Sequence, residues 1–478
     1  MKSQILELRK LIINGQKTVN DIINEACAKC DALKDTNSII TDTYQDAQQR
    51  AQDLQQHIQR AANNLLYGIP YVMKDGVCTK GIRTTAGSAF LKDFIPPYSA
   101  TIYENFNHHH AVMIGKSNMD EFGMGGDGIY SAYEIVKYFC DPTRVVGGSS
   151  SGSVSLVAAN VVPFAIGTDT GDSSRRPATL VGVVGYKPTY GLISRYGVMP
   201  YAPSLDHVGI ITNSVTDTAI VAQHMISFDE KDFTSQRIGN NQFYQNLKTV
   251  DKLTIGIIKE IEKYLTPDVL KAYLQCIEQL KSYGHTIKYV DFMDEYLNAI
   301  KTIYSVISYA EANSCWANLT GIPFGANFGG KNFDDISTTA RSKTLGQQAK
   351  RRFTIGAYIT KKENYEKYFM RTQKIRRLLV DQWNKCLNQV DVILTAGASS
   401  TTPKIQEVLA KTFKTTTADD FLCIANFAGT PSLSLPYSKI NGLPWGINLN
   451  CKQFADQTLL NIAHTIELQL ENQGVHYE

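Results

Sequence analysis

Short hydrophobic runs recur along this chain from Tyr67 onwards, and each is bounded by glycine, proline, asparagine or aspartate. Runs of this kind predict buried β-strands. Stretches with helical periodicity separate them, and the clearest are 267–283 and 361–387. Strands that alternate with helices predict an α/β fold whose sheet is mixed or parallel and is covered by helices on both faces. The predicted strands are 71–73, 111–114, 161–166, 254–258, 287–290, 390–394, 432–435 and 446–449.

The first 66 residues have a different pattern, in which helical periodicity alternates with polar turns. Thr18 and the residues that follow it form a helix start signal, and the glutamine-rich stretch 45–59 predicts a solvated helix. No repeat, linker or low-complexity segment divides the 478 residues. We therefore expect a single domain over 1–478, with an N-terminal helical segment over 1–66.

The bulk composition narrows the class of protein. Hydrophobic residues make up 43% and charged residues 19%, a balance that fills a globular core. The net charge of +3 gives no broad basic face, so nucleic-acid binding by this chain alone is not indicated. No window reaches the roughly 18 apolar residues that span a bilayer. Residues 1–16 read as an amphipathic helix rather than a secretory signal, and we expect no membrane association.

Nine cysteines are dispersed along the chain, and only Cys27 and Cys30 form a CxxC pair. A single pair of this kind on a predicted helix is weak evidence for zinc or redox chemistry. We interpret both residues as ordinary helix positions and expect no metal site. A dispersed, odd set of cysteines is typical of a reducing compartment, which predicts a cytoplasmic protein.

Glycine and serine are most concentrated in the segment 145–160, where a flexible loop runs into an apolar helix. Such a loop presents free backbone N–H groups at the positive end of a helix, which suits an anion or a developing negative charge. A phosphate site is one interpretation, although neither Gly-Lys-Ser/Thr nor GxGxxG occurs here. A small-residue turn needed for close packing is the other, and the loop by itself favours it.

Two further features lie near this segment in the sequence. Residues 167–177 follow a predicted strand and form a turn rich in glycine and hydroxyl groups, whose N–H groups can converge as an oxyanion hole. Upstream, Lys74 ends an apolar strand. Burial lowers the pKa of such a lysine towards values at which the neutral amine takes a proton from serine, a weak nucleophile unaided. The combination predicts a serine nucleophile with a lysine base.

Histidine is the competing candidate for the base. His108, His109 and His110 are expected at the exposed end of a helix, whereas His207 lies near the hydroxyl-rich turn in the sequence. His207 is compatible with a supporting position or with a Ser/His/Asp triad. No GxSxG nucleophile elbow accompanies it, which favours the lysine.

Longer motifs surround these residues, and they include Lys74-Asp-Gly-Val-Cys-Thr-Lys-Gly-Ile, Phe94-Ile-Pro-Pro-Tyr-Ser-Ala-Thr and Ile114-Gly-Lys-Ser-Asn-Met-Asp-Glu-Phe-Gly-Met. Together with 185–197, they resemble the amidase signature family, and within it the A subunits of aspartyl/glutamyl-tRNA amidotransferases. The similarity continues over 426–432 and 442–447 and is weaker over 225–345. It implies an amidase-signature-like fold with the signature region over 67–215.

The resemblance implies Ser–Ser–Lys chemistry at three positions of this sequence. Ser173 is the implied nucleophile that forms an acyl ester, Ser149 the proton relay and Lys74 the base. In the family the relay serine follows a cis peptide bond, which is costly before a residue other than proline. The implied oxyanion hole consists of the backbone N–H groups of Thr170, Gly171, Asp172 and Ser173, each worth roughly 3–4 kcal/mol in comparable enzymes.

For substrate binding, the resemblance implies two charged residues that complement glutamine. The guanidinium of Arg376 fits the α-carboxylate, and the carboxylate of Asp419 fits the α-ammonium group. Without the resemblance, Arg376 reads as a surface helix residue. Asp420 is a one-residue alternative to Asp419.

The sequence departs from the family pattern inside the implied site. The family usually has glycine where this chain has Ser151 and Asp172, an apolar residue at Ser174, and a more polar substrate-lining stretch over 125–133. A carboxylate about 4 Å from a developing oxyanion opposes it by roughly 4 kcal/mol at an effective dielectric near 20. The oxyanion loop therefore works only if Asp172 points away, for example towards one of the next two arginines. Aspartate itself is tolerated if this position needs a positive φ.

The implied function is that of a glutaminase subunit, which supplies ammonia for converting misacylated Glu-tRNA(Gln) to Gln-tRNA(Gln). The implied partners are two further amidotransferase subunits, of the B and C types. ATP and Mg²⁺ are expected at the B-type partner, tRNA binds through the complex, and no cofactor is expected in this chain. The alternatives are a stand-alone amidase for small amides and a catalytically degenerate scaffold subunit. Whether the product is glutaminyl-tRNA or asparaginyl-tRNA is left open.

Overall fold

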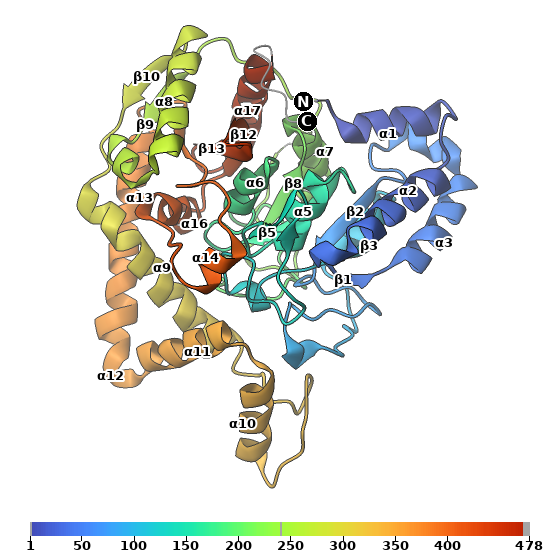
Figure 1. The fold of residues 1–478 in the computed structure, drawn as a ribbon, viewed down its shortest axis with the longest axis vertical. Helices are drawn as coiled ribbons and strands as arrows, with labels where there is room; N and C mark the ends of the chain where they lie inside the picture. The colour runs from blue at the N-terminus through green and yellow to red at the C-terminus, as the bar shows by residue number, and fades with distance from the viewer. Residues whose placement is uncertain (1, 240, 472–478) are drawn as a thin grey trace.

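One large β-sheet organises the protein in the computed structural model, which describes residues 2–239 and 241–471. Its eleven strands follow the order β1-β3-β2-β6-β8-β7-β12-β13-β11-β9-β10 (Figure 1). β2 pairs in parallel with β3 and β6, β9 does so with β10 and β11, and the remaining pairs are antiparallel, so the sheet is mixed. The strands are β1 (Ile39–Asp42), β2 (Pro70–Lys74), β3 (Val112–Ser117), β6 (Phe164–Asp169), β7 (Val184–Lys187), β8 (His207–Thr212), β9 (Thr254–Ile257), β10 (Thr286–Tyr289), β11 (Val392–Ala396), β12 (Ser432–Ile440) and β13 (Leu443–Asn450); β4 (Lys137–Tyr138) and β5 (Asp141–Val145) form a separate pair.

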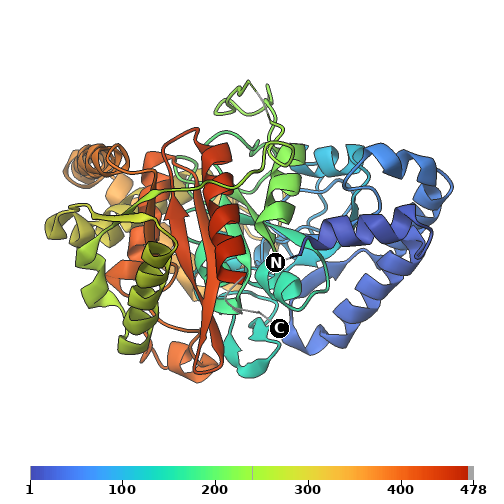
Figure 2. The same ribbon diagram turned by 90° about the horizontal axis from the view of Figure 1, so that it is seen from above.

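Helices cover both faces of this sheet. Every residue of β2, β3, β8 and β11 is buried. Because successive side chains of a strand point to opposite faces, both faces must be covered, which confirms the predicted α/β architecture. Figure 2 shows the N-terminal helices at one end of the molecule and α8 at the other. The helices are α1 (Gln4–Ile13), α2 (Val19–Ala32), α3 (Tyr44–Gln55), α4 (Thr101–His108), α5 (Ser151–Ala158), α6 (Arg175–Val181), α7 (Val215–Met225), α8 (Pro267–Ser282), α9 (Asp294–Cys315), α10 (Phe333–Thr344), α11 (Gln347–Thr360), α12 (Lys362–Tyr365), α13 (Arg371–Leu387), α14 (Ile405–Leu409), α15 (Thr417–Asp420), α16 (Ile424–Ala428) and α17 (Asp456–Glu471).

All eight predicted strands occur in the sheet, with bounds that differ by a few residues. The predicted strand 161–166 begins only at Phe164, after Pro163, which has no N–H to donate to a ladder. The hydrophobic pattern does not predict β7 and β8, because their buried positions include glycine, lysine, histidine and threonine. β8 nevertheless lies between β6 and β7 in the sheet, where it supports the loop that follows β6.

The N-terminal segment has the predicted helical character. Thr18 caps α2 in a reciprocal capping box with Asp21. The carboxylate of Asp217, on α7, accepts hydrogen bonds from the start of α1, including the backbone N–H of Gln4 at 3.0 Å. Cys27 and Cys30 lie on the buried face of α2, as expected for ordinary helix positions.

Two longer helical regions complete the fold. The predicted helix 361–387 consists of α12, a π-helical turn over 366–370, and α13. The weakly matching middle of the chain, 225–345, contains α8, α9 and α10, and α10 projects from the body (Figure 1). Among the described residues, no helix is both long and apolar enough to cross a membrane.

Candidate active site

Lys74 is the last residue of β2 and is fully buried. β2 and β6 run in parallel, so their carboxyl ends lie side by side and bring Lys74 to the loop after β6. Its ammonium nitrogen lies 2.7 Å from Ser149 Oγ, 3.0 Å from Ser150 Oγ and 2.8 Å from Thr168 Oγ1. Burial lowers the pKa of Lys74 to about 7, although nearby carboxylates, Asp120 first among them, oppose this shift. A substantial fraction of neutral amine is therefore present near neutral pH.

Ser149 lies in the glycine-serine loop that precedes α5. The peptide bond between Gly148 and Ser149 is cis, in agreement with the family pattern. The backbone N–H of Gly148 donates to the carbonyl of Gly126 at 2.7 Å. A Cβ atom on Gly148 would come within 2.3 Å of Asp120 Oδ2, so only glycine fits at this position. The loop that contains the candidate proton relay is therefore also closely packed.

Ser173 lies in the loop 170–174, between the end of β6 and the start of α6. The backbone N–H of Ser150 donates to the carbonyl of Ser173 at 3.2 Å, which holds the two loops together. Ser173 is 6% exposed, and its hydroxyl forms no hydrogen bond within the described chain. The backbone N–H groups of residues 170–173 likewise donate to no acceptor among the described residues. Successive unsatisfied donors beside a serine are what an oxyanion hole requires.

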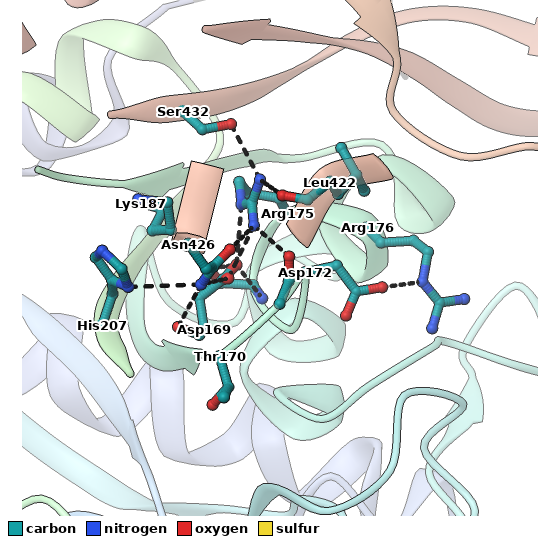
Figure 3. A network of polar contacts seen from close by, with 12 residues as sticks. Asp169, Thr170, Asp172, Arg175, Arg176, Lys187, His207, Leu422, Asn426 and Ser432 are labelled. Atoms are coloured by element: carbon teal, nitrogen blue, oxygen red, sulfur yellow. Dashed lines mark hydrogen bonds and ion pairs between the residues drawn. The ribbon is translucent and has the colours of Figure 1, made fainter. Parts of the chain in front are cut away.

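Arg175 holds this loop in place from inside the protein (Figure 3). Its guanidinium is fully buried and forms a bidentate ion pair with Asp169, at 3.0 and 2.9 Å. It also donates to the carbonyl of Gly171 at 2.6 Å. Burial opposes ionisation of Asp169, but Arg175 and Asn426 hold the pKa of its carboxyl well below the usual range. The remaining acceptors are Leu422 O, Ser432 Oγ and Asn426 Oδ1.

The side chain of Asp172 points towards Arg176. Arg176 Nε donates to Asp172 Oδ2 at 2.5 Å, and Figure 3 shows the two side chains turned towards each other. This is one of the two orientations that the sequence requires for a working oxyanion loop. Neither Gly171 nor Asp172 has a positive φ, so the backbone here does not need glycine for its conformation. The charge of Asp172, rather than its backbone, is the property that the structure has to compensate.

Two further departures from the family pattern, Ser174 and Ser151, have different surroundings. Ser174 is buried, and its backbone N–H and hydroxyl both donate to Asp169 Oδ2, at 3.1 and 2.9 Å. It thereby adds to the anchoring of the loop. Ser151 begins α5, and its buried hydroxyl has no hydrogen-bond partner among the described residues. Nothing in the structure explains why serine occurs at Ser151.

His207 begins β8 and is buried. Its Nδ1 lies 2.7 Å from the carbonyl oxygen of Leu205, and it contacts neither Ser149 nor Ser173 by a hydrogen bond. Burial, with Lys187 next in effect, lowers the pKa of His207 well below its usual value, so the imidazole is neutral. His207 is therefore a supporting residue, and the structure does not assemble a Ser/His/Asp triad around it.

The two charged residues expected to bind glutamine are already engaged in hydrogen bonds. Arg376 donates four, to the carbonyl and hydroxyl of Ser204 and twice to the carbonyl of Phe427, at 2.9–3.2 Å. Asp419 accepts three, from the N–H and hydroxyl of Ser399 at 2.9 and 2.5 Å and from the N–H of Thr416 at 2.8 Å. Both residues thus have structural contacts, and their roles in substrate binding stay predictions.

Arg352, on α11, is a residue of the site that the sequence pattern does not indicate. It is 6% exposed, donates to Tyr201 Oη at 2.5 Å and to the carbonyl of Gly125 at 3.2 Å, and has no hydrogen bond at Nε. Within the described residues no ion pair of Arg352 occurs, and its guanidinium lies over the rings of Tyr201 and Tyr309, 5.2 Å from each centroid. A buried guanidinium without an acid partner is costly unless an anion binds there. The signal in the sequence was an arginine pair, 351–352, inside an otherwise apolar helix face.

A narrow cavity of about 10 Å³, near the smallest that holds one water molecule, lies beside the oxyanion loop. Thr170, Tyr201, Asp206 and His207 are among the residues that line it. Thr170 Oγ1 donates to Asp206 Oδ1 at 2.6 Å, which fixes the first residue of the loop. Among the described residues, no group of three or more histidine, cysteine or acidic side chains is arranged to hold a metal ion.

Several known proteins are similar to this chain over nearly its whole length. The A subunit of glutamyl-tRNA(Gln) amidotransferase from Mycoplasma genitalium is 43% identical over 477 residues, which is 98% of each chain. The protein of the same name from Thermoanaerobacter pseudethanolicus is 36% identical over 97% of this chain and 95% of its own. The crystal structure of the corresponding protein from Thermotoga maritima superposes with a TM-score of 0.75 at 30% identity and covers 94% of each chain. A bacterial aryl acylamidase of the amidase signature family, at 20% identity, has a TM-score of 0.84 over 98% of this chain and 96% of its own, which shows the shared fold.

The length of the match to a family model shows to which family this chain belongs. The amidase family model matches residues 21–460, which include both loops of the candidate site and the strand that ends at Lys74. This chain belongs to the amidase family.

Proposed function

We propose that this chain is the glutamine-hydrolysing A subunit of a tRNA-dependent amidotransferase. The observation that carries the proposal is the 2.7 Å hydrogen bond between Lys74 Nζ and Ser149 Oγ, beside the unsatisfied N–H groups of residues 170–173. Relatives matched over nearly their whole length bear the name of that subunit, which supports glutamine as the substrate. The chemistry of the site accounts for each step of amide hydrolysis.

The first step forms an acyl ester on Ser173. Neutral Lys74 takes the proton of Ser149, and Ser149 takes the proton of Ser173 as its oxygen attacks the side-chain amide carbon of glutamine. The carbonyl oxygen becomes an oxyanion, which the N–H groups of residues 170–173 stabilise. Ser149 then gives a proton to the amide nitrogen and regains one from protonated Lys74, the C–N bond breaks and ammonia leaves.

The second step releases glutamate. Water attacks the acyl ester, and its proton passes through Ser149 to Lys74. The same N–H groups stabilise the second tetrahedral intermediate. The ester C–O bond breaks as the Ser173 oxygen takes a proton from Ser149, which regains one from protonated Lys74, so Lys74 is neutral again. Lys74 has to be neutral at the start of each half-reaction, so its burial is a requirement of the mechanism.

The α-carboxylate of glutamine needs a guanidinium with free donors. Arg376 has five N–H donors and uses four of them on Ser204 and Phe427, so its role as carboxylate ligand requires Ser204 to move. Arg352 is buried, uses two donors and has no acid partner. Arg352 is therefore the better-placed carboxylate ligand, and Arg376 supports the segment that begins at Ser204. Asp419 is the counterpart implied for the α-ammonium group.

The ammonia produced here is used by a partner. The proposed complex is cytoplasmic and contains two further subunits, of the B and C types. The B-type subunit binds ATP and Mg²⁺ and activates the glutamyl group of misacylated Glu-tRNA(Gln), which then accepts the ammonia. The chain described here needs no cofactor of its own for amide hydrolysis, because each proton transfer uses a side chain of the protein.

The pKa of Lys74 predicts the pH dependence of the reaction. Below about pH 7 the amine is protonated and cannot accept a proton, so kcat/KM for glutamine should rise about tenfold per pH unit and level off above about pH 7. Initial rates of ammonia release across about pH 5 to 9 measure this profile. A midpoint near the ordinary lysine pKa, or a flat profile, contradicts the assignment of Lys74.

A matched variant controls for other groups that titrate in this range. Burial raises the pKa of Asp420 to about 6, with Lys301 opposing the shift. The variant Asp420→Asn removes this carboxyl and should leave the midpoint of the profile unchanged. If the midpoint disappears in Asp420→Asn, the titrating group is Asp420 and not Lys74.

Partner dependence distinguishes the proposed function from a stand-alone amidase. The chain is purified with whatever subunits co-elute, and glutamine hydrolysis is measured with and without them and with and without tRNA. Strong stimulation by partners and tRNA is the expected result, because ammonia release without an acceptor wastes glutamine. Equal activity of the isolated chain, with a preference for other small amides, supports the stand-alone alternative.

A further inference from the structure

The narrow cavity beside the oxyanion loop borders each part of the candidate catalytic machinery. Thr170, the first residue of that loop, lines it. Thr168 lines it too, and Thr168 Oγ1 accepts a hydrogen bond from Lys74 at 2.8 Å. Gly123 is a third lining residue, and a Cβ atom at that position would lie 3.7 Å from Ser149 Oγ. A molecule in the cavity is therefore next to residues that contact the base, the proton relay and the oxyanion hole.

His207 brings an unpartnered polar atom to the wall of this cavity. It lines the cavity, is 4% exposed, and has its Nδ1 2.7 Å from the carbonyl oxygen of Leu205. Since a carbonyl only accepts, Nδ1 carries the ring proton. Asn426 Nδ2 is farther from Nδ1, at 3.5 Å, and donates to Asp169 and Leu205 at shorter distances. Nε2 is then an acceptor, and it is buried without a hydrogen-bond partner among the described residues.

The chemistry of this atom and the size of the cavity together select the ligand. A buried acceptor costs free energy unless a donor binds to it. The cavity volume of about 10 Å³ admits one water molecule, which can donate one proton to Nε2 and keep the other for a second hydrogen bond. Burial, with Lys187 next in effect, holds the pKa of His207 well below its usual value, so Nε2 stays an acceptor at neutral pH.

A wider cavity of about 320 Å³ connects this position with the surface. It shares four lining residues with the narrow cavity, and Phe233 in its own lining is exposed. The Nε–H of Arg195, one of the shared residues, is buried and has no hydrogen-bond partner within the described chain. It is a donor available to a water that passes between the two cavities. The other shared residues are Val198, Met199 and Asp206.

We infer that the narrow cavity holds the water that hydrolyses the acyl ester and that His207 positions this water through Nε2, an inference that rests on the acyl-ester mechanism of the proposed function. Thr170 belongs both to the cavity wall and to the oxyanion loop, so the water is held beside the loop on which the ester forms. The wider cavity supplies the next water once the first has reacted.

The step that this water carries out conserves every proton. The water oxygen forms a C–O bond to the acyl carbon, and one water proton passes to Ser149 as Ser149 gives its own to neutral Lys74. The hydrogen bond to His207 breaks as the water attacks, and no proton moves to the imidazole. The C–O bond to Ser173 then breaks, and a proton returns from Lys74 through Ser149 to the Ser173 oxygen.

Replacing His207 with leucine should slow hydrolysis of the acyl ester about tenfold or more and leave its formation within roughly twofold of the wild type. The variant is measured in the complete complex purified with its co-eluting subunits. With p-nitrophenyl butyrate, the burst of p-nitrophenolate measures acylation and the later steady phase measures deacylation. With glutamine, the γ-glutamyl ester on Ser173 should accumulate, which mass spectrometry of the acid-quenched complex detects.

Two further histidine variants test whether the effect belongs to Nε2. His224 Nδ1 also lies 2.7 Å from a backbone carbonyl, that of Ile220, but His224 is outside the cavity lining. His224→Leu should therefore leave both rates near the wild type. His207→Gln has a side-chain oxygen that accepts from water, and it should recover deacylation to within about threefold. Equal losses of both rates in His207→Leu show that His207 only supports the oxyanion loop, and they overturn the inference.

A cavity-filling variant keeps the test open if His207→Leu does not fold. Val198 lines both cavities, so the longer side chain of Val198→Met should obstruct the water and slow deacylation but not acylation. Unchanged deacylation in this variant contradicts the inference. Normal deacylation with less Gln-tRNA(Gln) formed per glutamate released assigns the cavity to ammonia instead, and it also overturns the inference.

The ester substrate separates this inference from the proposed function. A wild-type complex that releases no ammonia from glutamine refutes the proposed function. The burst experiment still decides the role of His207 in that case, because it requires only an acyl ester on Ser173. Selective loss of deacylation in His207→Leu supports the inference whichever amide is the natural substrate.

Discussion

Replacing Ser173 with alanine should reduce glutamine hydrolysis about 10⁴- to 10⁶-fold, the loss typical of a missing nucleophile. The remaining N–H groups and substrate contacts cannot form the acyl ester. Transamidation with ammonium chloride as the nitrogen source should stay at the wild-type rate, because that reaction bypasses the glutaminase site. Both activities are measured on one purified complex, by glutamate release and by conversion of Glu-tRNA(Gln).

The control for this variant is Ser151→Ala. Ser151 has a buried hydroxyl without a hydrogen-bond partner among the described residues, so its loss should leave both activities near the wild type. Retained glutamine-dependent activity in Ser173→Ala contradicts the assignment of the nucleophile. Consistent failure of an amidase-directed acylating reagent to label Ser173 in the wild type supports the degenerate scaffold instead.

Replacing Arg176 with methionine should reduce kcat for glutamine about 10³-fold. The variant leaves Asp172 without its partner, next to the developing oxyanion, where an uncompensated carboxylate about 4 Å away costs roughly 4 kcal/mol. Burial raises the pKa of Asp172 and Arg176 opposes this, so without Arg176 the carboxyl is partly protonated at low pH. The loss should therefore increase as the pH is raised. Steady-state kinetics of the complex at two pH values measure both effects.

A second substitution separates the effect of the Asp172 charge from the loss of the structural contacts of Arg176. The double variant Asp172→Gly with Arg176→Met removes the carboxylate and should recover most of kcat. If the double variant is as slow as Arg176→Met, the loss comes from the hydrogen bond between Arg176 and the carbonyl of Gly126 at 2.6 Å. In that case Arg176 does not act by neutralising the charge of Asp172.

Much of the fold could be predicted from the sequence because its signals are local. The alternation of apolar runs with helical stretches predicted eight strands, and all eight occur in the sheet. Of the three sheet strands it did not predict, β7 and β8 are buried by neighbours distant in sequence, so glycine, lysine and histidine occupy core positions there. The third, β1, is a short edge strand that is only partly buried. Local hydrophobicity cannot reveal burial that distant segments impose.

For the candidate site, the sequence by itself predicted the groups proposed to carry the chemistry. Lys74 at the end of an apolar strand had to be buried, and the loop after β6 had to present N–H groups beside Ser173, since both features follow from short stretches of chain. The sequence also determined that Asp172 had to point away from the oxyanion if the loop is to work.

Only the tertiary structure decided where the charges go. It directed Asp172 to Arg176 rather than Arg175, which is instead bonded to Asp169. It engaged Arg376 with Ser204, and it brought Arg352 to the carbonyl of Gly125 although these two residues lie far apart in the sequence. The physical reason is that Coulomb and hydrogen-bond energies depend on distances of a few ångströms between side chains, and those distances are fixed only when the whole sheet and its loops are packed.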